Sequence, residues 1–170
     1  MFFWLRILLL LLIALPASGE LVAFPGRSLI IDEENDLMWL DYPKASRNWP
    51  THNSAASSST DQGFIDWRLP TSAELLDLQT DYTLSYLDDY FKFGPVRNWV
   101  LWSSTSALPL WTVHTTRYYV VSFLDNNRSS IPQYSSFPAL FTRDVPDYYL
   151  KDSSGNYVLT SEGDFIDSGD

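Results

Sequence analysis

The 170-residue sequence contains no cysteine, and this absence excludes several kinds of site. Without a thiol there is no disulfide framework, lipid-modified cysteine, thiol nucleophile or cysteine-bound metal. A small domain without disulfides must obtain its stability from a hydrophobic core. The composition provides for one, because 45% of the residues are hydrophobic and 16% aromatic, with seven Trp. We therefore expect one globular domain that is stable without cross-links.

Positive charge is also scarce, with 11 Lys and Arg against 21 Asp and Glu and a formal net charge of −10. A chain of this sign repels phosphate backbones, sulfated polysaccharides and anionic lipid headgroups. The bases form no run, so nucleic acid is not a predicted partner. One route to a basic patch remains, in which folding gathers four arginines onto one strand face: Arg97, Arg117, Arg128 and Arg143.

Histidine is equally rare, and His52 and His114 lie far apart in the sequence. No Gly-x-Ser-x-Gly motif is present, although a Ser-His-Asp triad can assemble from distant residues. Two histidines without cysteine argue against a zinc site. Calcium stays open because of the carboxylate-rich residues 32–36, whereas the calcium-loop pattern that begins at Asp152 fails at Tyr157, where glycine is required. We predict no catalytic residue, no metal ligand and no cofactor.

Residues 1–19 have the pattern of a signal peptide. Arg6 gives a positive start, residues 7–15 are apolar, and Pro16 precedes three small residues. The apolar run is shorter than the ~20 residues that span a bilayer. We expect cleavage after Gly19 and an exported protein of bacterial type, periplasmic or secreted; an uncleaved membrane anchor is the alternative.

The remaining chain favours an α+β domain with one or two short helices and a small, mostly antiparallel sheet. Thr71 and Glu74 form a capping box that predicts a helix over residues 72–80. A short helix within residues 48–60 frays into a loop, and residues 82–94 form a second short helix or an ordered loop. Strands are expected at 28–32, 37–40, 99–102, 117–123 and 139–143. Residues 144–170 are an acidic hairpin or tail.

Three sequence blocks resemble the Lcl C-terminal domain family, a module of exported bacterial proteins. The blocks are Ile31-Asp32 with Asp36-Leu37-Met38-Trp39, Asp66-Trp67-Arg68-Leu69-Pro70-Thr71 with Glu74-Leu75, and Leu101-Trp102-Ser103-Ser104-Thr105-Ser106. The resemblance implies a single C-type-lectin-like domain over residues 20–143, similar also to sulfatase-modifying factors. The founding member of the family adheres to sulfated glycans, whereas the acidic charge of this chain weakens that expectation.

Most residues of these blocks are predicted to be structural. Alternation along an extended segment places Trp67 in the core, with Asp66 and Arg68 on the other face, bonded to neighbouring backbone or to each other. Ser103 and Ser104 are expected to bond the backbone of a loop that lacks ladder partners. The full structural set is Trp39, Asp66, Trp67, Arg68, Pro70, Thr71, Glu74, Trp102, Ser103 and Ser104.

Aromatic residues between positions 99 and 119 are the most suggestive candidates for ligand binding. Exposed aromatic rings stack on sugars or anchor protein interfaces. Core burial is the competing explanation for most of them, and we select Trp99, Trp111 and Tyr118 as candidates. The leading hypothesis is a non-enzymatic module that binds a glycan or a protein of the cell envelope through surface loops. A hydrolase with a carboxylate-based site is the alternative.

Overall fold

The computed structural model describes residues 20–24, 26–92, 95–107 and 115–146, apart from the side chain of Arg97. The predicted signal peptide, Trp111 and residues 147–170 lie outside this part of the chain. Helices and 3-10 turns there are α1 (Trp49–Ser57), η1 (Asp61–Gly63), α2 (Ser72–Asp81), α3 (Leu84–Tyr90) and η2 (Val96–Asn98). The strands are β1 (Leu21–Ala23), β2 (Leu29–Asp32), β3 (Leu37–Leu40), β4 (Lys44–Arg47), β5 (Val100–Ala107), β6 (Arg117–Ser122), β7 (Asn127–Pro132), β8 (Phe137–Ala139) and β9 (Thr142–Asp144).

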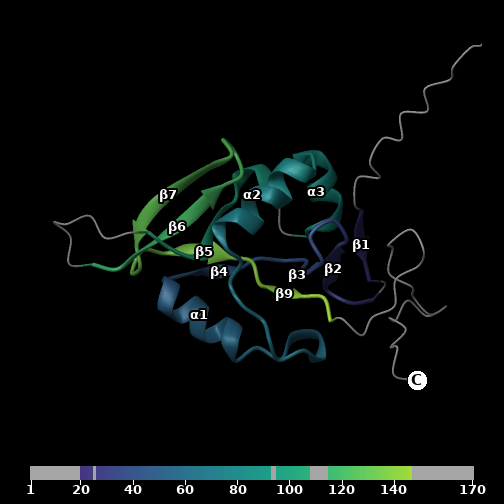
Figure 1. Cartoon of the computed structure of the whole chain (residues 1–170), viewed down its shortest axis with the longest axis horizontal. Helices are drawn as coiled ribbons and strands as arrows, with labels where there is room; N and C mark the ends of the chain where they lie inside the picture. Colours follow the sequence, from purple (N-terminus) through teal and green to yellow (C-terminus); the bar gives the residue numbers. More distant parts are fainter. Residues whose placement is uncertain (1–19, 25, 93–94, 108–114, 147–170) are drawn as a thin grey trace, which may run out of the picture.

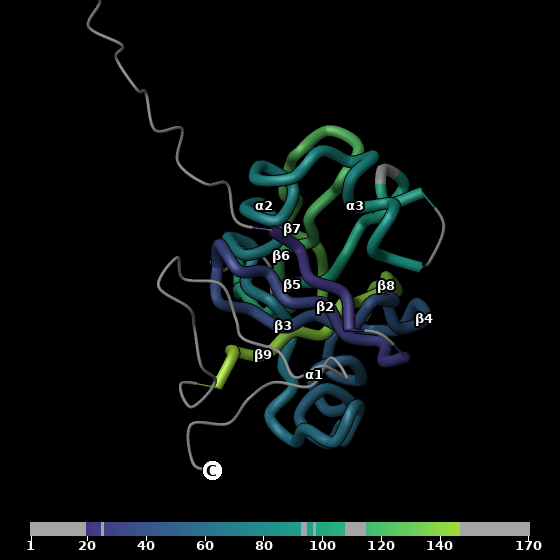
Figure 2. Tube along the Cα trace, turned by 90° about the vertical axis from the view of Figure 1, so that its right-hand side faces the viewer, coloured from purple at the N-terminus to yellow at the C-terminus, as the bar shows by residue number. Residues whose placement is uncertain are grey.

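An antiparallel sheet of order β1-β2-β3-β9 lies at the centre, and both of its faces are covered. Helices α2 and α3 lie on one side of it and α1 on the other (Figures 1 and 2). Every residue of β2 and β3 is buried for this reason. Because successive strand residues point to opposite faces, Trp39 joins one hydrophobic cluster and Met38 the other.

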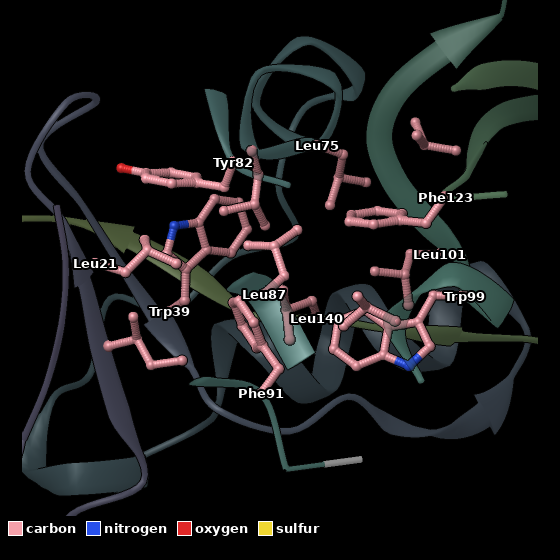
Figure 3. Packing of buried hydrophobic residues seen from close by; sticks show 14 of the residues in the cluster. Leu21, Trp39, Leu75, Tyr82, Leu87, Phe91, Trp99, Leu101, Phe123 and Leu140 are labelled. Atoms are coloured by element: carbon pink, nitrogen blue, oxygen red, sulfur yellow. The ribbon is translucent and has the colours of Figure 1, made fainter. Parts of the chain in front are cut away.

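The first cluster fills the space between the central sheet and the pair α2 and α3. Figure 3 shows Trp39 beside Leu87, with Phe91, Trp99 and Leu140 around them. The capping box predicted for α2 is present, since the Thr71 hydroxyl accepts from the Glu74 N–H and the Glu74 carboxylate accepts from the Thr71 N–H. Helix α3 confirms the helical alternative for residues 82–94.

The second cluster lies on the α1 side and contains two of the predicted core tryptophans. Trp67 is 2% exposed and Trp102 is fully buried. The Trp67 indole N–H donates to the Asp61 carbonyl at 2.9 Å, and the Trp102 indole N–H donates to the Arg47 carbonyl at 3.0 Å. Both rings therefore pack in the core while satisfying their polar atom, which confirms the core assignment.

The serine-rich block corrects one expectation. Ser103 and Ser104 belong to the strand β5, which pairs with β6 in an antiparallel sheet of order β5-β6-β7, rather than to a loop. The buried Ser103 hydroxyl donates to the Tyr119 carbonyl at 2.9 Å, and the Ser104 N–H donates to the Pro70 carbonyl at 2.7 Å. The bond of the Ser103 hydroxyl satisfies the one fully buried serine of this block.

Asp66 and Arg68 also bond differently from the prediction, because each side chain pairs with other charged side chains and not with the other member of the motif. The Asp66 carboxylate accepts two hydrogen bonds from Arg143, at 2.6 and 2.9 Å. Arg68 donates to both carboxylate oxygens of Glu74, at 2.9 and 2.8 Å, and to Asp144 at 2.7 Å. The Asp66–Arg143 and Arg68–Asp144 pairs tie the segment before α2 to β9.

The predicted α+β class with small antiparallel sheets is confirmed by these elements. Strands β1, β4 and β7 were not predicted, and the expected strand at 139–143 is divided between β8 and β9. Among the described residues, no helix has the length and apolar character needed to cross a membrane.

Candidate functional site

A pocket of about 280 Å³ opens on the α1 side of the molecule, between β4, α1 and η1. This volume is close to the lower end of the range, about 300–1,000 Å³, that small-molecule sites occupy. Phe141 and two alanines provide apolar surface, and several polar groups converge on it. The lining residues are Lys44, Ala45, Arg47, His52, Ala55, Ser59, Asp61 and Phe141.

An irregularity in β4 brings two cations to this pocket. Strand β4 pairs antiparallel with β8, with Lys44 opposite Ala139 and Arg47 opposite Phe137, and the register shifts between these pairs. Residues three apart in a regular strand point to opposite faces, whereas a bulge redirects the side chains that follow it. Lys44 and Arg47 consequently line the same pocket.

The turn η1 forms the opposite wall and is held in place from the core. Gln62 and Gly63 adopt left-handed backbone angles, with φ of 58° and 85°. The bond from the Trp67 indole to the Asp61 carbonyl anchors this turn. The Ser59 hydroxyl donates to the Asp61 carboxylate at 2.7 Å. The Asp61 side chain is thereby fixed toward β4.

Lys44 and Asp61 neutralise each other across the pocket, with 2.8 Å between Nζ and Oδ2. Partial burial opposes the charged form of Lys44, but hydrogen bonds to Asp61 and Tyr42 outweigh it and raise the pKa of the ammonium. Burial likewise opposes the charged form of Asp61, yet the bonds from Lys44 and Ser59 keep the pKa of that carboxyl below its ordinary value. Both groups are therefore charged at neutral pH.

His52 projects from α1 and presents a buried acceptor. Its side chain is almost fully buried, and Nε2 lies 3.0 Å from the Phe137 carbonyl, which can only accept. Burial lowers the pKa of the imidazole and the charge of Arg47 lowers it further, against the opposing bond to Phe137. The neutral ring therefore carries its hydrogen on Nε2. Its Nδ1 keeps a lone pair and has no hydrogen-bond partner in the described structure.

Arg47 is the second unmatched group of the pocket. Its backbone is fixed, because the Arg47 carbonyl accepts from the Trp102 indole. The residue is exposed, and no ion pair joins its guanidinium to the described residues. A donor group with fork geometry thus lines the same pocket as His52.

The pocket gathers Ser59, His52 and Asp61, but the hydrogen bonds do not connect them as a catalytic triad. Ser59 donates to Asp61, and His52 bonds to the backbone of Phe137. A triad requires a bond between nucleophile and base, with the acid orienting that base. A glycosidase site requires two carboxyl groups flanking the reacting bond, and Asp61 is the one carboxylate among the residues that line this pocket.

The aromatic candidates from the sequence lie elsewhere. Trp99 is 6% exposed and packs in the first cluster against Phe91 and Phe123, so its selection as a stacking residue is corrected. The reason is that β5 begins next to it and turns its ring toward the core. Tyr118 is half-buried and stacks on Trp49, with 3.6 Å between ring centroids. Trp111 lies outside the described residues.

Of the four arginines considered for a basic patch, the three with described side chains do not assemble into one. Arg117 and Arg128 belong to the β5-β6-β7 sheet, where Arg128 covers the Tyr119 ring at 4.9 Å. Arg143 belongs to β9 in the central sheet, is 6% exposed and pairs with Asp66. The side chain of Arg97 lies outside the described part of the structure.

We therefore expect the protein to pass through a heparin column without retention. Affinity for a sulfated chain comes from neutralising closely spaced negative charges with clustered Lys and Arg. The column is run at low ionic strength, where salt screens attraction between charges least. Retention that disappears as salt is added would reveal a basic patch strong enough to override the net charge of −10.

The described residues contain no group of three or more His, Asp and Glu suited to hold a metal ion. In the acidic turn, the buried Asp32 instead accepts from the Tyr82 hydroxyl at 2.8 Å and from the Asn35 amide at 3.0 Å. The Asp32 carboxylate is thus hydrogen-bonded to donors of the protein itself. Asp152 lies outside the described residues.

Neither a family model nor any curated protein matches the sequence, so membership of the Lcl C-terminal domain family stays a prediction. Among solved structures, the chain is similar to botrocetin, with a TM-score of 0.42 and 10% sequence identity. The match covers 73% of this chain and 95% of botrocetin. Botrocetin has a C-type-lectin-like fold.

Proposed function

We propose that this protein is an exported, non-enzymatic binding module that recognises a glycan through the pocket between β4, α1 and η1. The observation that carries the proposal is a charged donor beside an apolar wall. Arg47 is exposed, lines the pocket and forms no ion pair with the described residues. Phe141 lines the same space. Sugars present hydroxyl groups and apolar C–H faces together, and such a surface accommodates both.

The shape of the site favours a sugar over a protein partner. A stable protein interface buries about 800 Å² on each side and is centred on packed hot-spot residues. Here the converging groups lie within a pocket of about 280 Å³. A single sugar unit of a longer glycan is a better match to that volume than a folded surface.

A glycan array probed with residues 20–170 tests this function. Ala55 is exposed on α1 and lines the pocket, so Ala55→Trp fills the space without changing any charge. Asn53→Trp is the matched control, because Asn53 is exposed on the same helix outside the pocket. We expect the intact domain and the control to give the same glycan signals, and Ala55→Trp to lose them. Equal signals from all three proteins, or none from the intact domain, would contradict the proposal.

Export rests on the pattern of residues 1–19 and has its own test. Cleavage after the small residues 17–19 predicts a mature protein that begins at or near Glu20. Mass spectrometry of the protein from its native source measures this terminus. Recovery of the intact N-terminal segment in a membrane fraction would show that the segment is kept as an anchor.

A further inference from the structure

We infer that the pocket selects an acidic sugar with a single carboxylate, such as a uronic acid, and that Arg47 pairs with that carboxylate. The inference rests on the proposed function, since it assigns the ligand class of the same pocket. It follows from the local balance of charge and from the apolar wall of the pocket.

The local charge of the pocket is opposite to that of the protein. Lys44 and Asp61 form a pair at 2.8 Å and cancel. Arg47 then contributes one uncompensated positive charge among the described lining residues, within a chain of net charge −10. A guanidinium binds a carboxylate through two parallel hydrogen bonds, a geometry that a single hydroxyl cannot match.

The second requirement comes from the rest of the pocket. Phe141 provides an apolar wall, and the Lys44–Asp61 pair adds polar atoms. A sugar ring has apolar C–H faces and hydroxyl groups, so it meets both conditions. The carboxylate for Arg47 and the ring for the apolar wall together distinguish an acidic sugar from a simple carboxylic acid or a neutral sugar.

The same balance limits the ligand to one negative charge at this site. One cation without an ion-pair partner among the described residues balances one anion, and the net charge of −10 repels further negative groups. A densely sulfated chain is therefore a poor ligand, in agreement with the expected passage through heparin. An acidic sugar at the end of a chain, or one flanked by neutral sugars, meets the condition.

Calorimetric titration with small glycosides tests this assignment. The probes are the methyl glycosides of glucuronic and galacturonic acid, and those of glucose and galactose, which carry a hydroxymethyl group in place of the carboxylate. We expect at least one acidic glycoside to bind about tenfold or more tightly than its neutral counterpart, as a charge-assisted bond allows. Arg47→Gln should remove that difference, and Arg47→Lys should restore part of it.

Arg128→Gln is the matched control, because it removes the same charge from an exposed arginine outside the pocket. Its preference for the acidic glycoside should equal that of the unaltered protein. Equal binding of acidic and neutral glycosides, unaffected by Arg47→Gln but abolished by Ala55→Trp, would overturn the inference and leave the proposed function intact. Absence of binding by all four probes, with no glycan signal on the array either, would overturn both.

Discussion

Replacing Trp67 by Ala is expected to lower the free energy of unfolding by about 3–5 kcal/mol, the usual cost of truncating a buried aromatic residue. The ring is 2% exposed and packs in the second cluster with Phe64 edge-on at 6.3 Å between centroids. Removing it leaves a cavity and withdraws the donor that anchors η1 at the Asp61 carbonyl. The pocket wall loses its support at the same time, so ligand binding should weaken as well.

Denaturant unfolding of the two proteins measures the change. Ile65→Ala is the control, because Ile65 lies two residues away and is 76% exposed. That substitution should stay within about 0.5 kcal/mol of the parent, as exposed positions usually do. A Trp67→Ala protein that unfolds at the same denaturant concentration as the parent would place Trp67 on the surface and refute the described core.

Replacing Asp66 by Ala is expected to cost about 2 kcal/mol, because it leaves the Arg143 guanidinium without its counter-ion. The Arg143 side chain is 7% exposed, and its guanidinium lies 4.1 Å from the Phe64 ring centroid. Removal of one partner from a buried pair costs about 3–5 kcal/mol. The Asp66 side chain is 56% exposed, so solvent moderates the loss.

A second substitution distinguishes the contribution of the ion pair to stability from that of packing. With Arg143→Met added, the double variant no longer contains an unpaired buried charge, and Met occupies similar apolar surroundings beside Met38. Its stability should return most of the way to that of the parent. The double variant could instead lose as much free energy of unfolding relative to Asp66→Ala as that variant loses relative to the parent. Arg143 would then contribute by packing and not through the ion pair.

The ion pair also predicts a pH dependence. Hydrogen bonds from Arg143 hold the pKa of the Asp66 carboxyl below its ordinary value. A carboxyl with a lowered folded-state pKa stabilises the protein above its unfolded-state pKa, near pH 4, and this contribution is lost as the pH falls through the lower folded value. Unfolding curves recorded between pH 6 and pH 2.5 should therefore converge for the parent and Asp66→Ala. Curves that stay a constant distance apart would contradict this contribution.

Local signals in the sequence predicted the elements that depend on neighbours along the chain. The capping box of Thr71 and Glu74 located the start of α2 because both of its bonds join residues three apart. The apolar runs located β2 and β3 because both faces of these strands are buried. Strand β4 carries no such pattern, since three of its four residues are exposed, and its pairing with β8 joins segments about ninety residues apart.

The sequence did not predict the pocket, because the pocket also depends on contacts between residues distant in the chain. Arg47 was counted among scattered bases, and only the shifted register of β4 directs it toward α1. His52 stands far from His114 in the sequence, and its place in the pocket wall follows from a bond to Phe137, a residue distant in the chain. For Trp99 the error was the opposite one, since a buried residue was predicted to bind ligand. The sequence alone does not distinguish an aromatic residue that fills a core from one that stacks on a sugar.

The central claim is that the pocket between β4, α1 and η1 is where the ligand binds, and NMR titration of the isotope-labelled domain tests it most directly. The titrant is the glycan that gives the strongest array signal. The account predicts that the largest amide shifts fall on the pocket lining, at Arg47, Ala55 and Asp61. Shifts confined to the β6–β7 hairpin, with those three residues unmoved, would contradict it.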